Sequence, residues 1–188
     1  MQAIINACNS GSLQAIPTVV ISNNSKSGAL ERAEREGIPH YHLSGNHYTD
    51  PRDLDQAILS IMIEHSVDII VLAGYMKKLG KKTLEYFEGR ILNIHPALLP
   101  KYGGKGMYGI NVHKAVISSG EKESGVSIHI VDSDYDTGPI IAQSRVTVFP
   151  SDTVETLAKK ILQKEHTLFP ETLQKIVDGE IALPKKGK

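Results

Sequence analysis

The 188-residue sequence contains no tryptophan, only three phenylalanines and a single cysteine, Cys8. One thiol cannot form an internal disulfide bond, which suits a reducing compartment. Cys8 has no Cys or His near it in a metal-binding spacing, so we interpret it as a small buried apolar residue. Hydrophobic residues still make up 40% of the chain. The core must therefore consist mainly of Ile, Leu, Val and Ala, as in a parallel sheet covered by helices.

An excess of charge of either sign is also missing, because 21 Lys and Arg residues balance 21 Asp and Glu residues. Proteins that wrap nucleic acid usually carry a basic excess, so we expect no nucleic-acid partner. No segment reaches the roughly 18 uninterrupted apolar residues of a membrane span, and the N-terminus does not resemble a signal peptide. We therefore expect one cytoplasmic domain over residues 1–188, without a membrane partner and with a solvated basic end at 185–188.

Short segments rich in Val and Ile alternate with segments of helical periodicity along the chain. Strands are expected at 16–22, 40–43, 67–73 and 89–94, and helices at 28–36, from 51 onward, at 111–118 and at 153–177. Two later segments, 125–131 and 139–148, alternate more clearly and should pair antiparallel with each other. A break in the last helix is expected at Pro170. This order predicts an α/β fold, a doubly wound and mostly parallel sheet flanked by helices.

The residues best suited to chemistry stand at the end of the fourth expected strand, in Asn93-Ile94-His95-Pro96. Residues two apart in an extended segment point to the same side, so Asn93 and His95 can share a face. An amide donor and an imidazole can together stabilise the negative oxygen of an attacked carbonyl. The alternative is a polar pair that satisfies the end of a strand, and spacing alone does not separate the two interpretations.

A later loop, Asp132-Ser133-Asp134-Tyr135-Asp136-Thr137-Gly138-Pro139, has acids at three alternating positions. It is not an EF-hand, because its sixth position is not Gly and no acid stands at the twelfth. We expect Asp136 to face the cleft, raise the pKa of His95 and keep the imidazole protonated. Asp132 and Asp134 should cap the turn or face solvent. Neither a serine nucleophile elbow nor a metal-ligand motif is present, so no metal is expected.

The segment Asn93-Ile94-His95-Pro96-Ala97-Leu98-Leu99-Pro100 resembles the Asn-Ile-His-Pro-Ser-Leu-Leu-Pro pattern of the folate-dependent formyltransferases, with Ala97 in place of Ser. Further similar segments lie at 2–5, 71–76, 127–129, 136–139, 163–166 and 169–170. The resemblance implies a Rossmann-like formyltransferase fold. It also implies transfer of a formyl group from 10-formyltetrahydrofolate to the amine of phosphoribosylglycinamide, in purine biosynthesis. The implied partners are therefore small molecules, and the implied assembly is a monomer or a homodimer.

The resemblance assigns roles to residues at matching positions. Asn93, His95 and Asp136 would be the catalytic residues, with Ser127 and His129 supporting them. Asn93 and a protonated His95 would stabilise the tetrahedral oxyanion, while Asp136 would hold the charge on His95 and assist proton movement.

Ligand-binding roles are implied as well. Glu165 would contact the ribonucleotide, and a Gly-rich stretch at 102–109 resembles a mobile loop near the site. The residues implied to bind the folate are Arg52, Met76, Lys77, Lys78, Leu79, Asn93, Val131 and Asp136. Lys77 stands where the family often has Arg, so a planar guanidinium contact is not expected there.

The start of the chain departs from the family pattern. The family opens with a strand and a glycine-rich loop whose backbone amides hold the substrate phosphate at a helix N-terminus. Met1 and Gln2 begin where that loop should have ended, so we expect an N-terminally shortened chain without the first strand. Two alternatives follow: a folate-binding but inactive fragment, and another 10-formyltetrahydrofolate-dependent formyltransferase or deformylase.

Overall fold

The computed structural model describes residues 1–184, and the basic end at 185–188 lies outside the described part. The chain divides into two compact units, one built from residues 1–91 with Pro184 and the other from residues 92–183. Each unit contains its own cluster of buried apolar side chains. Helices and strands occur in both, so the predicted α/β class is confirmed. The single domain expected over residues 1–188 stays a prediction.

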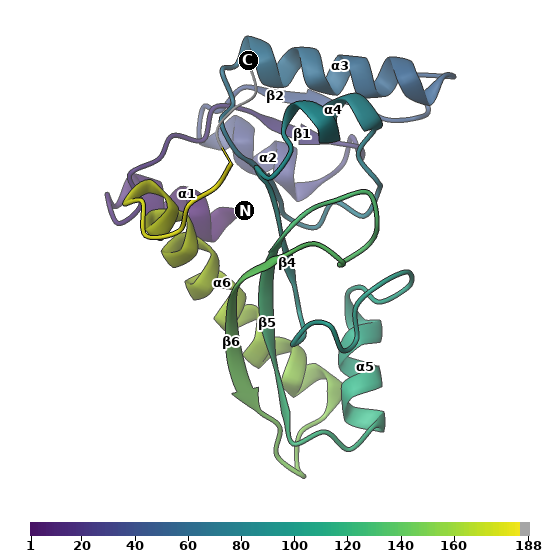
Figure 1. Ribbon diagram of the computed structural model, residues 1–188, viewed down its shortest axis with the longest axis vertical. Coiled ribbons are helices and arrows are strands. Elements are labelled where there is room, and N and C mark those ends of the chain that lie inside the picture. The colour runs from purple at the N-terminus through teal and green to yellow at the C-terminus, as the bar shows by residue number, and fades with distance from the viewer. Residues whose placement is uncertain (185–188) are drawn as a thin grey trace. The chain divides into compact units, whose positions relative to one another are not determined.

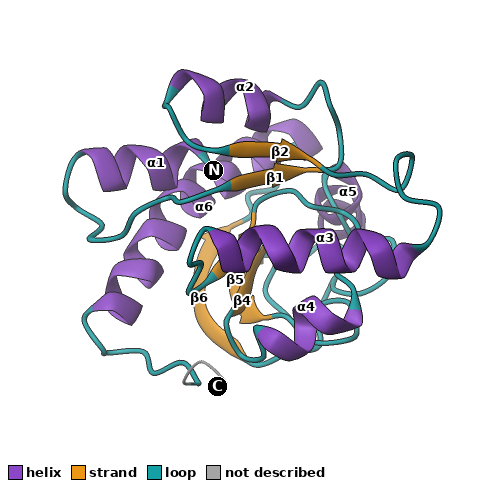
Figure 2. Cartoon of the chain, turned by 90° about the horizontal axis from the view of Figure 1, so that it is seen from above, coloured by secondary structure: helices purple, strands orange, loops and turns teal. Residues whose placement is uncertain are grey.

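The first unit begins with a helix and a short parallel strand pair. Its elements are α1 (Gln2–Asn9), β1 (Val20–Ser22), α2 (Gly28–Arg35), β2 (His40–His42), α3 (Pro51–Glu64), β3 (Ile70–Leu72) and α4 (Lys81–Tyr86). β1 and β2 are parallel, and α2, which connects them, packs against both (Figure 2). Ile5, Ala33 and Ile38 form the buried cluster of this region. Both strands are shorter than the sequence predicts, because the paired register covers only three residues of each.

The starts of α2 and α3 follow local sequence signals, whereas the N-cap residues of α1 and α4 make no side-chain capping hydrogen bond. The Asp50 side chain accepts a hydrogen bond from the Arg52 N–H, and Pro51 occupies the first turn of α3, as predicted. The periodicity of the sequence does not predict α4. The carboxylate of Asp55 on α3 accepts hydrogen bonds from the backbone N–H groups of Lys82 and Thr83, at 2.8 and 3.1 Å. The cap of α4 is therefore supplied from a distant part of the sequence.

The second unit contains an antiparallel sheet covered by helices. Its elements are β4 (Ile91–His95), α5 (Ile110–Ser118), β5 (Glu123–Ile130), β6 (Ile140–Thr147) and α6 (Val154–Val177). β5 pairs antiparallel with both β4 and β6, and α6 packs against β5, β6 and α5 (Figure 1). The core consists of Val116, Val126, Val146, Leu157 and Ile161. The antiparallel pairing expected between the two late segments is confirmed.

The break expected at Pro170 is wrong, because α6 continues through this residue to Val177. Proline removes one backbone donor and crowds the preceding turn, which costs about 3 kcal/mol in a helix interior. Phe169 and Leu173 are buried on the same helix. The helix also begins with a capping box, in which Thr153 and Thr156 exchange hydrogen bonds with each other's backbone N–H. The burial of Phe169 and Leu173, together with the capping box, outweighs the free-energy cost of Pro170.

Candidate active site

Four polar side chains share one face of the sheet in the second unit. Asn93 and His95 occupy alternate positions of β4, so both point to the same side. On β5, His129 stands directly opposite Asn93 and Ser127 opposite His95. Residues directly opposite each other on antiparallel strands project from the same face. The two predicted catalytic residues and the two predicted supporting residues are therefore neighbours.

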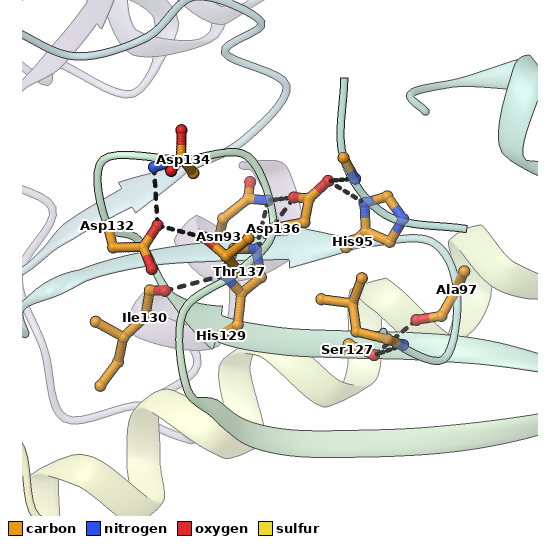
Figure 3. A network of polar contacts seen from close by, with 12 residues as sticks. Asn93, His95, Ala97, Ser127, His129, Ile130, Asp132, Asp134, Asp136 and Thr137 are labelled. Carbon is orange, nitrogen blue, oxygen red and sulfur yellow. Dashed lines mark hydrogen bonds and ion pairs between the residues drawn. The ribbon is translucent and has the colours of Figure 1, made fainter. Parts of the chain in front are cut away.

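Asp136 completes this group from the loop between β5 and β6 (Figure 3). Its backbone has φ of 59°, a left-handed conformation that is uncommon outside glycine. Its Oδ2 atom lies 3.5 Å from Nδ1 of His95, and its Oδ1 atom lies 3.4 Å from Nε2 of His129. The same Oδ1 lies 3.5 Å from the amide nitrogen of Asn93. The structure thus brings together all three residues expected to be catalytic.

The other two acids of the loop have local roles. Oδ1 of Asp132 accepts hydrogen bonds from the Asp134 N–H and the Thr137 hydroxyl, at 3.0 and 2.8 Å. Both Asp132 and Asp134 are exposed. These contacts close the turn that presents Asp136, as expected from the sequence.

His95 is buried, and one of its ring nitrogens forms a hydrogen bond with the backbone. Nε2 lies 2.7 Å from the carbonyl oxygen of Tyr102. A carbonyl can only accept, so Nε2 must carry a hydrogen. The nitrogen free to exchange a proton is therefore Nδ1, which faces Asp136.

The pKa of His95 is lowered, because burial disfavours the charged imidazolium. The Asp136 carboxylate and the Tyr102 carbonyl act in the opposite direction, and the nearby His129 adds to the lowering. The expected net rise in this pKa is wrong. The carboxylate is present, as predicted, but the loss of hydration outweighs it. Neutral His95 has a lone pair on Nδ1 and is a proton acceptor.

The pKa of Asp136 is lowered despite burial, which by itself would raise it. The contact with His129 and the hydrogen bond from the Gly104 N–H favour the carboxylate, as does the positive charge of either histidine whenever it is protonated. Asp136 is therefore ionised at neutral pH. A proton received by His95 would be held beside a negative charge.

The side-chain amide nitrogen of Asn93 makes one short and one long polar contact. His129 Nδ1 lies 3.0 Å from the carbonyl oxygen of Ile130, so this nitrogen carries a hydrogen. The amide nitrogen of Asn93 lies 3.0 Å from Nε2 of His129. The second amide hydrogen faces Asp136 at 3.5 Å, beyond the favoured range for N–H···O bonds. It is the donor that a ligand oxygen can take over.

Ser127 ties the segment after His95 to β5. Its buried hydroxyl donates to the Ala97 carbonyl at 2.6 Å and accepts from the Leu99 N–H at 3.0 Å. Gln143 on β6 donates to the same hydroxyl at 2.8 Å and to the Leu99 carbonyl at 3.0 Å. The supporting position expected for Ser127 is thereby given a physical basis.

Sequence reasoning missed Gln143 and the backbone contacts of Tyr102 and Gly104. A signal existed for Gln143, since it stands directly opposite Ser127 in the β5–β6 ladder. Backbone donors and acceptors have no signature in residue type. The glycine-rich stretch at 102–109 was nevertheless expected near the site, and its first part contacts His95 and Asp136.

The residues expected to bind ligands belong to both units. Glu165 lies on α6, and burial raises its pKa to about 7. Val131 is half-buried. In the first unit, Met76, Lys77 and Lys78 are exposed and Leu79 is half-buried, while the exposed Arg52 forms an ion pair with Asp50 at 2.6 Å. Their ligand-binding roles stay predictions.

Within residues 1–184, no group of three or more His, Cys, Asp or Glu side chains could hold a metal ion. Over the same residues, none of the helices has the length and apolar character needed to cross a bilayer.

Comparison with known proteins identifies the family. The formyl transferase family model matches residues 1–173. The phosphoribosylglycinamide formyltransferase of Haemophilus influenzae is 36% identical over all of this chain and 92% of its own length. The chloroplastic phosphoribosylglycinamide formyltransferase of Arabidopsis thaliana is 40% identical over 98% of this chain, which spans 63% of that relative's length. The crystal structure of glycinamide ribonucleotide transformylase 1 from Symbiobacterium toebii has a TM-score of 0.89 and 34% identity, covering 98% of this chain and 85% of that one. The chain therefore belongs to the formyl transferase family and is similar over its whole length to phosphoribosylglycinamide formyltransferases.

Proposed function

We propose that this chain transfers the formyl group of 10-formyltetrahydrofolate to the amine of phosphoribosylglycinamide. The observation that carries the proposal is the convergence of Asn93, His95 and Asp136 on one face of the sheet, within 3.5 Å of one another's polar atoms along the network. The choice of substrate is supported by the relatives, which are named phosphoribosylglycinamide formyltransferases. The arrangement of the site indicates the chemistry.

The reaction requires a proton to move from one nitrogen to another. A bond forms between the substrate amine and the formyl carbon, and the bond from that carbon to N10 of the folate breaks. The amine loses one proton and N10 gains one. Neutral His95 can receive the proton at Nδ1, directly or through a water held by Asp136, and then deliver it to N10. Asp136 stabilises the intermediate imidazolium, which its 3.5 Å distance from Nδ1 allows.

Negative charge develops on the formyl oxygen when the amine attacks. The loosely held second N–H of Asn93 can donate to this oxygen, while the bond to His129 keeps the amide oriented. A preoriented donor of this kind typically contributes about 10²- to 10³-fold to kcat. Transient imidazolium at His95 adds electrostatic stabilisation of the same oxyanion.

The ligand-binding assignments are part of the proposal. Glu165 contacts the ribonucleotide, and the folate is held by the residues carried over from the resemblance: Arg52, Met76, Lys77, Lys78, Leu79, Asn93, Val131 and Asp136. The chain works on small molecules as a monomer or a homodimer. A cytoplasmic location is the expectation from the sequence, although one similar protein is named as chloroplastic.

The proposal is tested by mixing the protein with 10-formyltetrahydrofolate, with and without phosphoribosylglycinamide, and following the folate absorbance. Formylated product that appears only when phosphoribosylglycinamide is present supports the proposal. Release of formate without the acceptor would instead identify a deformylase. Folate binding by calorimetry without any turnover would favour the inactive folate-binding fragment.

A further inference from the structure

A turn of three residues, Tyr102 to Gly104, contacts two of the proposed catalytic residues through its backbone alone. The Tyr102 carbonyl accepts from Nε2 of His95 at 2.7 Å. The Gly104 N–H donates to Oδ2 of Asp136 at 2.9 Å. This Oδ2 is the oxygen that faces Nδ1 of His95. We propose that the turn at 102–104 is a positioning element that selects the proton-exchanging nitrogen of His95 and keeps Asp136 ionised; the inference rests on the proposed function.

The conformation of the turn is one that few residues adopt. Tyr102 has φ of 58° and Gly104 has φ of 93°, both in the left-handed region. Between them, a Cβ on Gly103 would lie 2.6 Å from Cδ2 of Leu99 and 3.2 Å from Cβ of Asp136. The turn can therefore approach Asp136 closely only because position 103 has no side chain. The contact with Asp136 therefore depends on the particular backbone conformation at 102–104.

Each backbone group has a separate chemical consequence. The carbonyl of Tyr102 holds the hydrogen on Nε2, which leaves Nδ1 as the acceptor beside Asp136. The N–H of Gly104 is a donor to the charged form of the carboxylate, and hydrogen bonds to a charged form lower the pKa of an acid. Loss of the Gly104 contact should leave the fold intact and let Asp136 take up a proton at a higher pH.

Two glycines of the same stretch form a matched pair for the test. Gly104 and Gly106 have φ of 93° and 89°, and an added Cβ would meet nothing within 4 Å at either position. Alanine strains the backbone equally at both, since L side chains rarely adopt these angles. Of the two, Gly104 donates its N–H to Asp136, whereas the Gly106 carbonyl accepts from the Asn111 side-chain amide. Gly104→Ala should turn the donor away, and Gly106→Ala should not.

The experiment follows the carboxyl carbon of Asp136 by ¹³C NMR through a pH titration, beside the single-turnover rate of formyl transfer. In Gly104→Ala the carboxyl should titrate at higher pH than in the wild type, and the rate should fall about 10- to 100-fold. In Gly106→Ala both should match the wild type. If Gly104→Ala does not fold, replacing Gly104 by glycolic acid through semisynthesis removes the N–H and adds no side chain, with the same result expected.

The titration and the rate separate the two proposals. An unchanged Asp136 titration in the Gly104 variant, or an equal change in Gly106→Ala, would overturn the positioning role. A shifted titration in a protein that transfers no formyl group would support the positioning role and refute the proposed function.

Discussion

Replacing Ser127 by alanine removes a hydroxyl that holds the segment after His95 to the sheet. This hydroxyl is fully buried and takes part in three hydrogen bonds, with the Ala97 carbonyl, the Leu99 N–H and the Gln143 amide. A typical hydrogen bond contributes a net 0.5–1.5 kcal/mol, so the three together stabilise the fold by about 1.5–4.5 kcal/mol. That is a large part of the roughly 5–15 kcal/mol by which a domain is stable.

Ser124 on the same strand provides a matched control. It is equally buried, but its hydroxyl has no hydrogen-bond partner among the residues that the structure describes. Removing an unsatisfied buried hydroxyl is neutral or stabilising. Urea denaturation should therefore show a large loss of unfolding free energy for Ser127→Ala and no loss for Ser124→Ala. Equal losses in the two variants would show that burial, and not the three hydrogen bonds of Ser127, accounts for the effect.

Three further predictions concern charge and proton transfer. Asp136→Asn keeps the shape of the side chain but removes the charge beside His95, so kcat should fall about 10²- to 10⁴-fold in the folate absorbance assay. Asn93→Asp removes the oxyanion donor and should lower kcat about 10²- to 10³-fold in the same assay; a variant as active as the wild type would exclude this role. Burial raises the pKa of Glu165 from 4.5 to about 7, so the folded state binds more protons than the unfolded state between these values and loses stability as the pH rises through them. Glu165→Gln should therefore gain up to roughly 3 kcal/mol over the wild type in denaturation at pH 8 and nothing at pH 4, and a gain independent of pH would contradict the burial of this carboxyl.

Features that depend on nearby residues were predictable from the sequence. The start of α3 follows from Asp50 and Pro51, which together satisfy and preset the first turn. The pairing of β5 with β6 follows from the clear alternation in both segments. The shared face of Asn93 and His95 follows from the two-residue period of a strand.

Features that depend on distant residues were not predictable in this way. α4 is capped by Asp55, more than twenty residues earlier in the chain, so no local signal marks its start. The pKa of His95 depends on how completely the ring is buried, and the sequence indicates the carboxylate partner but not the lost hydration. Pro170 is a local helix breaker, yet the apolar contacts of its neighbours on α6 outweigh that preference.

The family expected from Asn93 to Pro100 and the α/β class are confirmed by the comparisons. The reason is that the motif combines residue type, spacing and order, which together are far more specific than either polar residue alone. The roles of the individual residues stay predictions, because similarity over the whole chain does not measure what any one side chain does.

In the proposed mechanism, Nδ1 of His95 moves the proton in formyl transfer. His95→Gln tests it most directly, because the glutamine amide can still donate to the Tyr102 carbonyl as Nε2 does, but offers no basic nitrogen to Asp136. We expect a variant that binds 10-formyltetrahydrofolate as the wild type does and transfers its formyl group about 10²- to 10⁴-fold more slowly in a single turnover. A single-turnover rate equal to that of the wild type would exclude His95 as the group that moves the proton.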